Sequence, residues 1–125
     1  MLEIGEYFRT KDGCIGRITE DFGKDPCFRN INYYRTDILY TMPGCYASYN
    51  IYEDMIVKHS KNIIDLIEVG DYVNGSEVLD KHIPRDVWEP IELRINDRYT
   101  SFLINEDIKT ILTKEQYEAN IYKIN

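Results

Sequence analysis

The chain has 125 residues, of which 43% are hydrophobic and 30% are charged, so it has the size and composition of one globular domain rather than of a disordered segment. Its formal net charge of −7 argues against general binding to nucleic acid through phosphates, but it permits attraction to a basic protein surface. No apolar run approaches the roughly 18 residues of a membrane helix, and the N-terminus lacks the pattern of a signal peptide. We therefore expect a single domain over residues 1–125.

The N-terminal half, residues 1–58, is expected to consist of β-strands. Residues 4–20 predict a hairpin whose turn is formed by Asp12-Gly13. Residues 20–28 predict a loop, because glycine and proline interrupt this stretch. The further elements expected in this half are strands at 37–40 and 51–58 and a turn at 41–44.

The centre of the chain, residues 59–69, predicts a short hinge helix between two β-rich halves. Four aliphatic side chains between Ile63 and Ile67 recur at helix-like spacing, and a glycine then ends the helix. Asp71–Val73 predicts a strand, since tyrosine and valine fit a pleated surface. Asn74-Gly75 is the strongest hairpin signal in the chain, because both residues tolerate a positive φ.

The N-terminal hairpin has an internal echo in the centre of the chain. Ile4–Phe8 matches Val69–Val73 position by position in residue type, and each stretch is followed by a turn that contains glycine. Five matched positions are compatible with a structural repeat and equally with two ordinary hairpins.

The C-terminal half, residues 70–125, continues the β pattern and ends in a helix. Residues 81–90 predict a polar loop, in which Trp88 is expected to fill the edge of a core. Residues 91–95 alternate between apolar and charged side chains, which is typical of a half-buried strand. The remaining expected elements are a returning strand at 99–104, a capping box at Thr113–Gln116, a helix near 114–120 and a closing strand at 121–124.

Six of the eleven tyrosines lie between Asn30 and Tyr52. Tyrosine gathers at interfaces, because it offers a large, stiff contact area with a polar tip, but it also suits half-buried strands. We interpret most of these tyrosines as structural and expect Tyr46 and Tyr49 to be the exposed ones.

The sequence contains no pattern that identifies a catalytic or metal site. There is no glycine-rich phosphate loop, no nucleophile elbow and no pair of carboxylates set apart for acid–base work, so we predict neither an enzyme nor a cofactor. The three cysteines, Cys14, Cys27 and Cys45, lack the spacing of a zinc site and are expected to be thiols in a reducing compartment. A metal site built from Asp54, Asp65, Asp71 and His59 is less favoured than roles of these residues in turns and loops.

Two classes of binding remain open. The first is a protein partner that contacts the acidic C-terminal half and the tyrosine-rich loops, with candidate residues Tyr46, Tyr49, Glu89, Glu92 and Asp97. The second is a small anionic ligand such as a signalling nucleotide, for which the best cluster of aromatic and basic side chains is Arg29, Tyr33, Tyr34 and Arg35. A DNA-binding barrel is disfavoured by the charge.

Three stretches of the chain resemble a known group of proteins. These are the central KHSKNIIDLIEVGDYVNG (58–75), the opening IGEYFRTKDG (4–13) and the closing TKEQY (113–117). They look similar to small, mostly uncharacterised proteins that phages and prophages of clostridium-like bacteria encode. Residues 21–55 and 80–105 are individual to this chain, and no catalytic residues are carried over.

The resemblance implies an accessory protein of a mobile element, working in the cytoplasm of a bacterial host. Small acidic phage proteins include anti-CRISPR and other anti-defence inhibitors, which occupy a basic channel or block assembly. The hypothesis is therefore a non-enzymatic protein that inhibits a host defence complex, such as a CRISPR nuclease, by direct binding. The alternatives are a nucleotide sponge and a structural or regulatory phage protein. For the fold, we expect a mainly β (α+β) domain with one or two short helices, as a hairpin-based SH3-like barrel or two small packed sheets.

Overall fold

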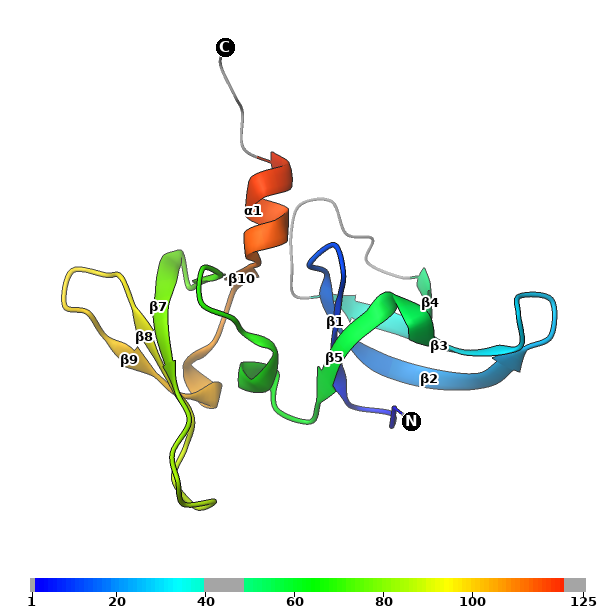
Figure 1. The fold of residues 1–125 in the computed structure, drawn as a ribbon, viewed down its shortest axis with the longest axis horizontal. Coiled ribbons are helices and arrows are strands. Elements are labelled where there is room, and N and C mark those ends of the chain that lie inside the picture. The colour runs from blue at the N-terminus through cyan, green and yellow to red at the C-terminus, as the bar shows by residue number, and fades with distance from the viewer. Residues whose placement is uncertain (1, 40–48, 121–125) are drawn as a thin grey trace, which may run out of the picture.

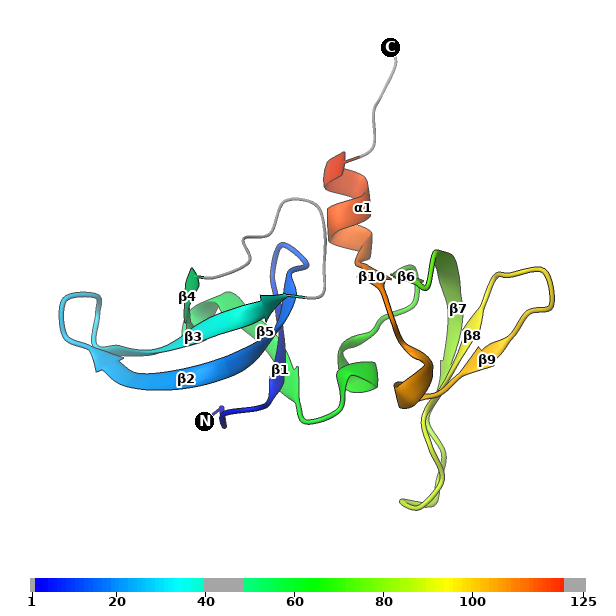
Figure 2. The ribbon, with the colours of Figure 1, turned by 180° about the vertical axis from the view of Figure 1, so that it is seen from behind.

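The structure is a computed structural model that describes residues 2–39 and 49–120. Its described part is mainly β and contains two five-stranded antiparallel sheets and one short α-helix, which confirms the predicted fold class. The prediction named either an SH3-like barrel or two small packed sheets, and the structure has two small sheets. The sheets lie side by side in Figure 1, and helix α1 (Lys114–Asn120) rises beside the junction between them, as Figure 2 also shows.

The first sheet has the strand order β4-β3-β2-β1-β5, and the second has the order β10-β6-β7-β8-β9. The strands of the first sheet are β1 (Tyr7–Thr10), β2 (Ile15–Asp25), β3 (Ile31–Leu39), β4 (Tyr49–Tyr52) and β5 (Ile56–Ser60). Those of the second are β6 (Tyr72–Val73), β7 (Ser76–His82), β8 (Glu92–Ile95), β9 (Phe102–Leu103) and β10 (Ile111–Leu112). The described 3-10 turns are η1 (Glu53–Met55), η2 (Ile63–Leu66) and η3 (Asn105–Asp107).

The second sheet repeats the topology of the first. Adding five to each strand number converts the order β4-β3-β2-β1-β5 into β9-β8-β7-β6-β10, which is the second sheet written in reverse direction. A 3-10 turn precedes the last strand in both sheets, as η1 before β5 and η3 before β10. A helical element follows the last strand in both, as η2 after β5 and α1 after β10. We call these two units the first and second repeats.

The backbone hydrogen bonds at the start of each repeat agree with this correspondence. The N–H of Gly5 donates to the carbonyl of Ile18 at 2.9 Å, and the N–H of Gly70 donates to the carbonyl of Val78 at 3.0 Å. Both glycines have a left-handed φ, +92° and +97°, which a side chain would disfavour. The echo between Ile4–Phe8 and Val69–Val73 is therefore a structural repeat.

An acidic residue closes the same turn in both repeats. The carboxylate of Glu6 accepts from the N–H of Glu3 at 2.6 Å, and that of Asp71 accepts from the N–H of Glu68 at 2.7 Å. Both acidic residues are buried, at 9% and 0% exposure. A buried carboxylate needs hydrogen-bond donors, so these local bonds explain why an acid occupies the position in each copy.

Two hydrophobic cores form, one under each sheet, and both follow the alternation of side chains along the strands. The smaller core belongs to the first sheet and consists of Leu2, Phe8, Ile18, Tyr34 and Ile51. The larger core combines η2 with the second sheet and consists of Ile15, Ile63, Ile64, Leu66, Ile67, Val73, Val78, Leu93, Ile95 and Ile111. Because Ile15 comes from β2, the larger core also joins the two repeats.

The expected hinge helix is shorter than its predicted range of 59–69. Only η2 is helical, while His59 and Ser60 still belong to β5. Ser60 does not cap η2, whose N-cap is Asn62. Instead its hydroxyl accepts from the N–H of Asn62 and donates to the carboxylate of Asp65. The aliphatic residues of η2 are buried, as their spacing predicted.

Other element boundaries also differ from the prediction. Residues 20–25 are not a loop, because β2 continues to Asp25 and absorbs Gly23 as a shift in its register with β3. Residues 51–58 are not one strand, because η1 divides them into β4 and β5. The helix predicted near 114–120 is confirmed. The predicted turn at 41–44 and strand at 121–124 lie outside the described residues.

No helix in the part of the chain described here is long and apolar enough to cross a membrane.

Candidate protein-binding surfaces

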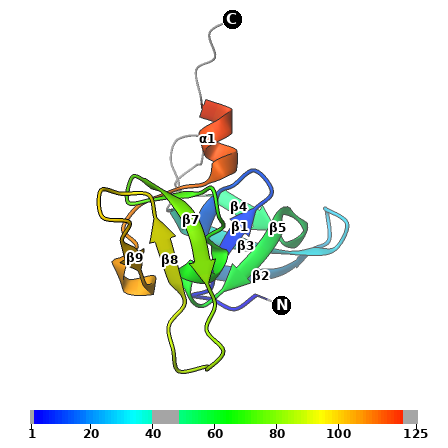
Figure 3. The ribbon, with the colours of Figure 1, turned by 60° about the vertical axis from the view of Figure 1, so that its left-hand side comes forward.

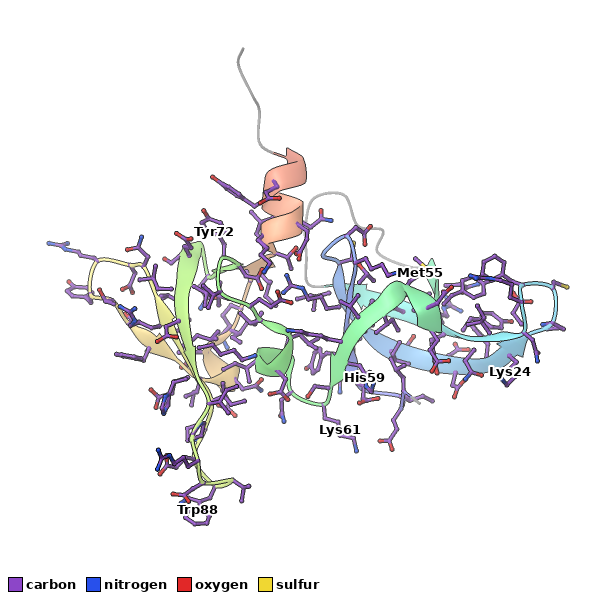
Figure 4. The ribbon with its side chains drawn as sticks, in the orientation of Figure 1. Lys24, Met55, His59, Lys61, Tyr72 and Trp88 are labelled. Carbon is purple, nitrogen blue, oxygen red and sulfur yellow. The ribbon has the colours of Figure 1, made fainter. Side chains whose placement is uncertain are left out.

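The loop between β7 and β8, residues 83–91, exposes apolar side chains to solvent. Ile83 is 69% exposed, Val87 98% and Trp88 79%. Figure 3 shows this loop extending below the second sheet, and Figure 4 places Trp88 at its far end. The expectation that Trp88 fills a core edge is therefore wrong. Clustered exposed apolar side chains are typical of a contact site, and tryptophan is enriched among the residues that contribute most to binding.

A pocket of about 290 Å³ lies at the base of this loop. Its walls are Asn62, Ile64, Asp65, Val87, Glu89, Pro90, Ile91, Asn105 and Glu106. Three of these residues are acidic and none is lysine or arginine, a composition that favours a basic partner. We call the loop and pocket together the apolar-acidic surface.

Lys81 of β7 holds one wall of this pocket in place. Its ammonium group donates to the carbonyls of Asp65 at 3.1 Å and Ile67 at 3.0 Å. Burial lowers the pKa of Lys81, and the neighbouring charge of Lys58 lowers it further. The contact ties η2 to the second sheet, and Lys81 therefore has a positioning role.

A row of four aromatic rings lies at the outer end of the first sheet. The ring centroids are 5.0 Å apart between Phe22 and Tyr33, 5.6 Å between Tyr33 and Tyr52, and 4.5 Å between Tyr52 and Phe28. Tyr33 and Tyr52 are direct cross-strand partners of β3 and β4. Phe22 and Phe28 are 38% and 41% exposed. We call this feature the aromatic row.

Carboxylates surround the aromatic row. Asp25 accepts a hydrogen bond from the hydroxyl of Tyr52 at 2.7 Å, and this bond raises the pKa of Tyr52. Asp54 forms an ion pair with Arg29 at 2.5 Å, and the guanidinium of Arg29 lies 4.9 Å from the ring centroid of Phe28. The row therefore combines ring faces with carboxylates, an arrangement that suits cations.

The described residues include a charged cluster whose centre, Arg9 with Asp71, is inaccessible to solvent. Arg9 is 1% exposed and forms ion pairs with Asp71 at 2.5 Å, Glu115 at 2.7 Å and Glu68 at 3.6 Å. Burial alone would lower the pKa of Arg9, but the hydrogen bond and charge of Asp71 raise it. We assign this cluster to the junction between the repeats rather than to ligand binding.

The predicted partner-binding residues fall in different places. Glu89 lines the acidic pocket, and Glu92 begins β8 beside the same loop. Asp97 accepts from the N–H groups of Tyr99 and Ser101 and from the Ser101 hydroxyl, which lowers its pKa. Asp97 thus shapes the β8–β9 turn and is not brought to the pocket. Tyr46 lies outside the described residues, and Tyr49 begins β4.

The predicted nucleotide-binding residues are divided between two faces of the first sheet. Tyr33 lies in the aromatic row beside Tyr52, and Arg29 is next to Phe28. Tyr34, the neighbour of Tyr33, points into the smaller core with 0% exposure. Alternation along β3 therefore contradicts the grouping of Tyr34 with the others. Arg35 is exposed and lies 3.8 Å from the carboxylate of Glu20.

Sequence reasoning missed most residues of both surfaces. Phe22 and Phe28 lie in the stretch that the sequence predicts as a loop, and no pattern in it indicates that they form the two ends of the row. For Trp88, the signal was present in the flanking Pro84 and Pro90, which keep a loop out of the sheet.

The residues considered for a metal site do not converge. His59 lies 3.0 Å from the carboxylate of Glu6, while Asp71 is engaged by Arg9. Within residues 2–39 and 49–120, no group of three or more metal-ligating side chains is found. The prediction of thiols is wrong for Cys14, which is buried and disulfide-bonded, whereas Cys27 is exposed and free.

Comparison with known proteins adds no relationship to this geometry. No protein-family model matches the chain, and neither a curated protein nor a solved structure gives a match.

Proposed function

We propose that this chain is a non-enzymatic binding protein that inhibits a host defence complex, such as a CRISPR nuclease, by direct contact in the cytoplasm of a bacterial host. The observation that carries the proposal is the exposure of Val87 and Trp88, 98% and 79%, at the end of a loop beside an acidic pocket. The phage context of the proposal comes from the sequence resemblance alone.

The apolar-acidic surface supports a protein partner in two ways. An exposed tryptophan beside valine can enter an apolar recess, and burying such side chains supplies much of the energy of an interface. The carboxylates of Asp65, Glu89 and Glu106 favour a basic rim around that recess. Proteins that bind nucleic acid offer such basic surfaces.

The first experiment measures inhibition of defence in a bacterial host that carries an active CRISPR nuclease. The wild-type chain is compared with the double variant Val87→Ala/Trp88→Ala and with Tyr99→Ala. Tyr99 is the matched control, since it is also 79% exposed but belongs to the β8–β9 turn. We expect phage plating to be restored by the wild type and Tyr99→Ala and not by the double variant.

Thermal unfolding of the purified variants accompanies the plating assay. The double variant removes exposed side chains, so its unfolding midpoint should match that of the wild type. Full inhibition by a folded double variant would remove the loop from the proposal. Absence of inhibition by the wild type against every defence system tested would overturn the function itself.

The acidic part of the surface is tested by Glu89→Gln combined with Glu106→Gln. Because long-range attraction speeds association, we expect a lower association rate with the partner and a weaker dependence on salt. Asp97 is left unchanged in this test, because its carboxylate holds the β8–β9 turn. An unchanged association rate and salt dependence would remove the electrostatic part of the proposal.

A further inference from the structure

We propose that the aromatic row and its two carboxylates, Asp25 and Asp54, form a second binding site, which takes an arginine-bearing segment of a protein partner. This site lies in the first repeat, whereas the exposed loop of the apolar-acidic surface, residues 83–91, lies in the second. It is independent of the proposed function, since it requires no particular partner and no defence complex.

The rings offer a stacking face for a planar cation. A guanidinium is planar, is weakly hydrated for a cation and stacks on aromatic rings. The four rings are in continuous contact at centroid distances from 4.5 to 5.6 Å, and the outer two are exposed. Ring-to-ring contact holds the side chains of Tyr33 and Tyr52 in place, so little side-chain entropy is lost when a ligand binds.

The carboxylates supply the charge that an arginine requires. Asp25 accepts from the hydroxyl of Tyr52 and from the N–H of Cys27, and Asp54 pairs with Arg29, whose guanidinium lies over the ring of Phe28. Carboxylates accept guanidinium hydrogen bonds in a geometry that lysine does not match.

Arg29 already shows the predicted mode of recognition within the chain. Its guanidinium lies over Phe28 and pairs with Asp54, so one aromatic face and one carboxylate hold an arginine together. The side chains of Arg29 and Asp54 are 64% and 41% exposed. An exposed ion pair of this kind contributes little to stability, so an arginine from a partner can replace Arg29 without disturbing the fold.

This site and the loop of the apolar-acidic surface occupy equivalent positions in the two repeats. Phe28 and Arg29 lie in the loop between β2 and β3, and Val87 and Trp88 lie in the corresponding loop between β7 and β8. Both loops are exposed and both carry an aromatic side chain. The β2–β3 and β7–β8 loops are thus equivalent in the duplicated fold, but their side chains differ in chemistry.

The charge around the row favours a cationic ligand over a nucleotide. Among the described residues, the charged side chains that printed contacts place at the row are Asp25, Asp54 and Arg29. Figure 4 places Lys24 at the outer end of the β2–β3 hairpin. A phosphate would meet the two carboxylates, Asp25 and Asp54, whereas an arginine is attracted by them.

The experiment starts from a library of random short peptides displayed to the immobilised full-length chain at low salt. Enriched peptides are synthesised, and their affinities are measured by fluorescence anisotropy for the wild type and four variants. The variants are Tyr33→Leu/Tyr52→Leu, Asp25→Asn/Asp54→Asn, Arg29→Asn and Tyr117→Ala. Tyr117 is the matched control, because it stacks on Tyr72 at 4.7 Å in the second repeat and is 39% exposed.

We expect enriched peptides to contain arginine, and we expect the double tyrosine and double aspartate variants to lose their binding. Tyr117→Ala should bind like the wild type. Arg29→Asn is the decisive variant, since asparagine tolerates the left-handed φ of +52° at this position. The substitution removes the Arg29 guanidinium, which competes with the peptide for Asp54 and Phe28. The affinity for arginine peptides should therefore rise by roughly threefold to fivefold, the factor that one exposed ion pair supplies.

Three results would overturn the proposal. The first is a selection that returns no peptides, or peptides without arginine. The second is weaker binding by Arg29→Asn, which would indicate an anionic ligand. The third is binding of a labelled oligodeoxythymidine that the double tyrosine variant loses, since it would identify the row as a base-stacking site for nucleic acid. Each result leaves the test of the apolar-acidic surface unaffected.

Discussion

Arg9 and Asp71 lie in different repeats and form a two-pronged ion pair in the interior of the molecule. The Nη1–Oδ2 distance is 2.5 Å and the Nη2–Oδ1 distance is 3.0 Å, and the side chains are 1% and 0% exposed. Arg9 also donates to the carbonyl of Leu66 at 2.9 Å and to Glu115 at 2.7 Å. Asp71 accepts further from the N–H of Lys114, so the pair joins β1, η2 and α1.

The pair gives the duplicated turn a new role in the second repeat. Glu6, the equivalent of Asp71, pairs with His59 of β5 and thus stays within the first sheet. Asp71 instead forms an ion pair with Arg9, which belongs to the first repeat. The same carboxylate position therefore closes a local turn in both copies, and in the second copy it also fixes the arrangement of the two repeats.

Arg9→Met should destabilise the protein strongly. The substitution leaves the carboxylate of Asp71 buried without its cation, and breaking a buried pair in this way costs about 3–5 kcal/mol. The free energy of unfolding in urea measures the effect. The double variant Arg9→Met/Asp71→Asn should recover part of the loss, because it removes the buried charge while asparagine can still accept from the N–H of Glu68.

The exposed pair Arg29–Asp54 provides the comparison for this prediction. Arg29→Asn breaks an ion pair of similar length, 2.5 Å, at the surface, and we expect a loss below about 1 kcal/mol. Equal losses for Arg9→Met and Arg29→Asn would show that the buried pair does not stabilise the junction.

Glu68 should make stability depend on pH in the acid range. Burial alone would raise the pKa of Glu68, but hydrogen bonds from Lys114 and Lys58 and the charge of Arg9 lower it from 4.5 to about 2. A group whose pKa is lower in the folded state stabilises the protein above its unfolded pKa, and the effect is lost as pH falls toward the folded pKa. The contribution at neutral pH is at most about 3 kcal/mol.

Glu68→Gln therefore should lower stability at neutral pH and flatten the loss of stability between about pH 5 and pH 2. Urea unfolding across this range measures both effects. Glu118→Gln, at an exposed position of α1, changes the net charge equally and serves as the control. A Glu68→Gln profile parallel to that of the wild type would contradict the assignment.

The local pattern of the sequence was sufficient to predict much of the fold. The alternation at Leu93 and Ile95 and the helix signal at Thr113 correspond to observed elements. The N–H of Gln116 does donate to the Thr113 hydroxyl at 3.3 Å. The Gln116 side chain instead donates to the carbonyl of Asp12 at 2.6 Å, a contact that depends on the packing of α1 against a distant turn.

Other features depended on partners that lie far apart in the chain and could not be predicted. The continuation of β2 to Asp25 is decided by pairing with β3, which overrides the glycine signal at Gly23, and the strand ends directly before Pro26. Tyr33 and Tyr34 are adjacent and of the same residue type, so only the orientation of β3 decides which one is buried. The ion pair between Arg9 and Asp71 spans 62 positions, beyond the reach of local pattern.

Asn74→Gly should weaken the attachment of β10 to the β6–β7 hairpin. Asn74 has a left-handed φ of +53°, which glycine also adopts. Its side chain donates to the carbonyl of Asp107 at 2.8 Å and accepts from the N–H groups of Lys109 and Thr110 at 2.8 and 3.1 Å. Losing these bonds should cost about 1–3 kcal/mol in urea unfolding.

Asn30→Gly is the matched change for Asn74→Gly. Asn30 is also left-handed, with a φ of +56°, but it lies exposed in the β2–β3 turn. We expect a change of less than about 0.5 kcal/mol, as for most surface substitutions. If both variants lose stability equally, the side-chain bonds of Asn74 do not hold β10 in place.

Gly13→Ala should separate α1 from the first repeat, whereas Gly75→Ala should not. Both glycines lie in hairpin turns at similar φ values, +86° and +84°, so alanine meets the same backbone strain of about 1 kcal/mol at each. At Gly75 an added Cβ meets open space. At Gly13 it would lie 2.3 Å from the hydroxyl oxygen of Thr113 and 2.9 Å from the Cβ of Glu115.

The overlap at Gly13 cannot be relieved without moving α1, because the Thr113 hydroxyl donates to the Gly13 carbonyl at 2.8 Å. We therefore expect Gly13→Ala to cost at least about 2 kcal/mol more than Gly75→Ala. Amide hydrogen exchange should show the excess loss in α1 and around Asp71, whose carboxylate holds the first N–H of the helix. Equal losses for the two variants, with unchanged exchange in α1, would show that the helix does not depend on this contact.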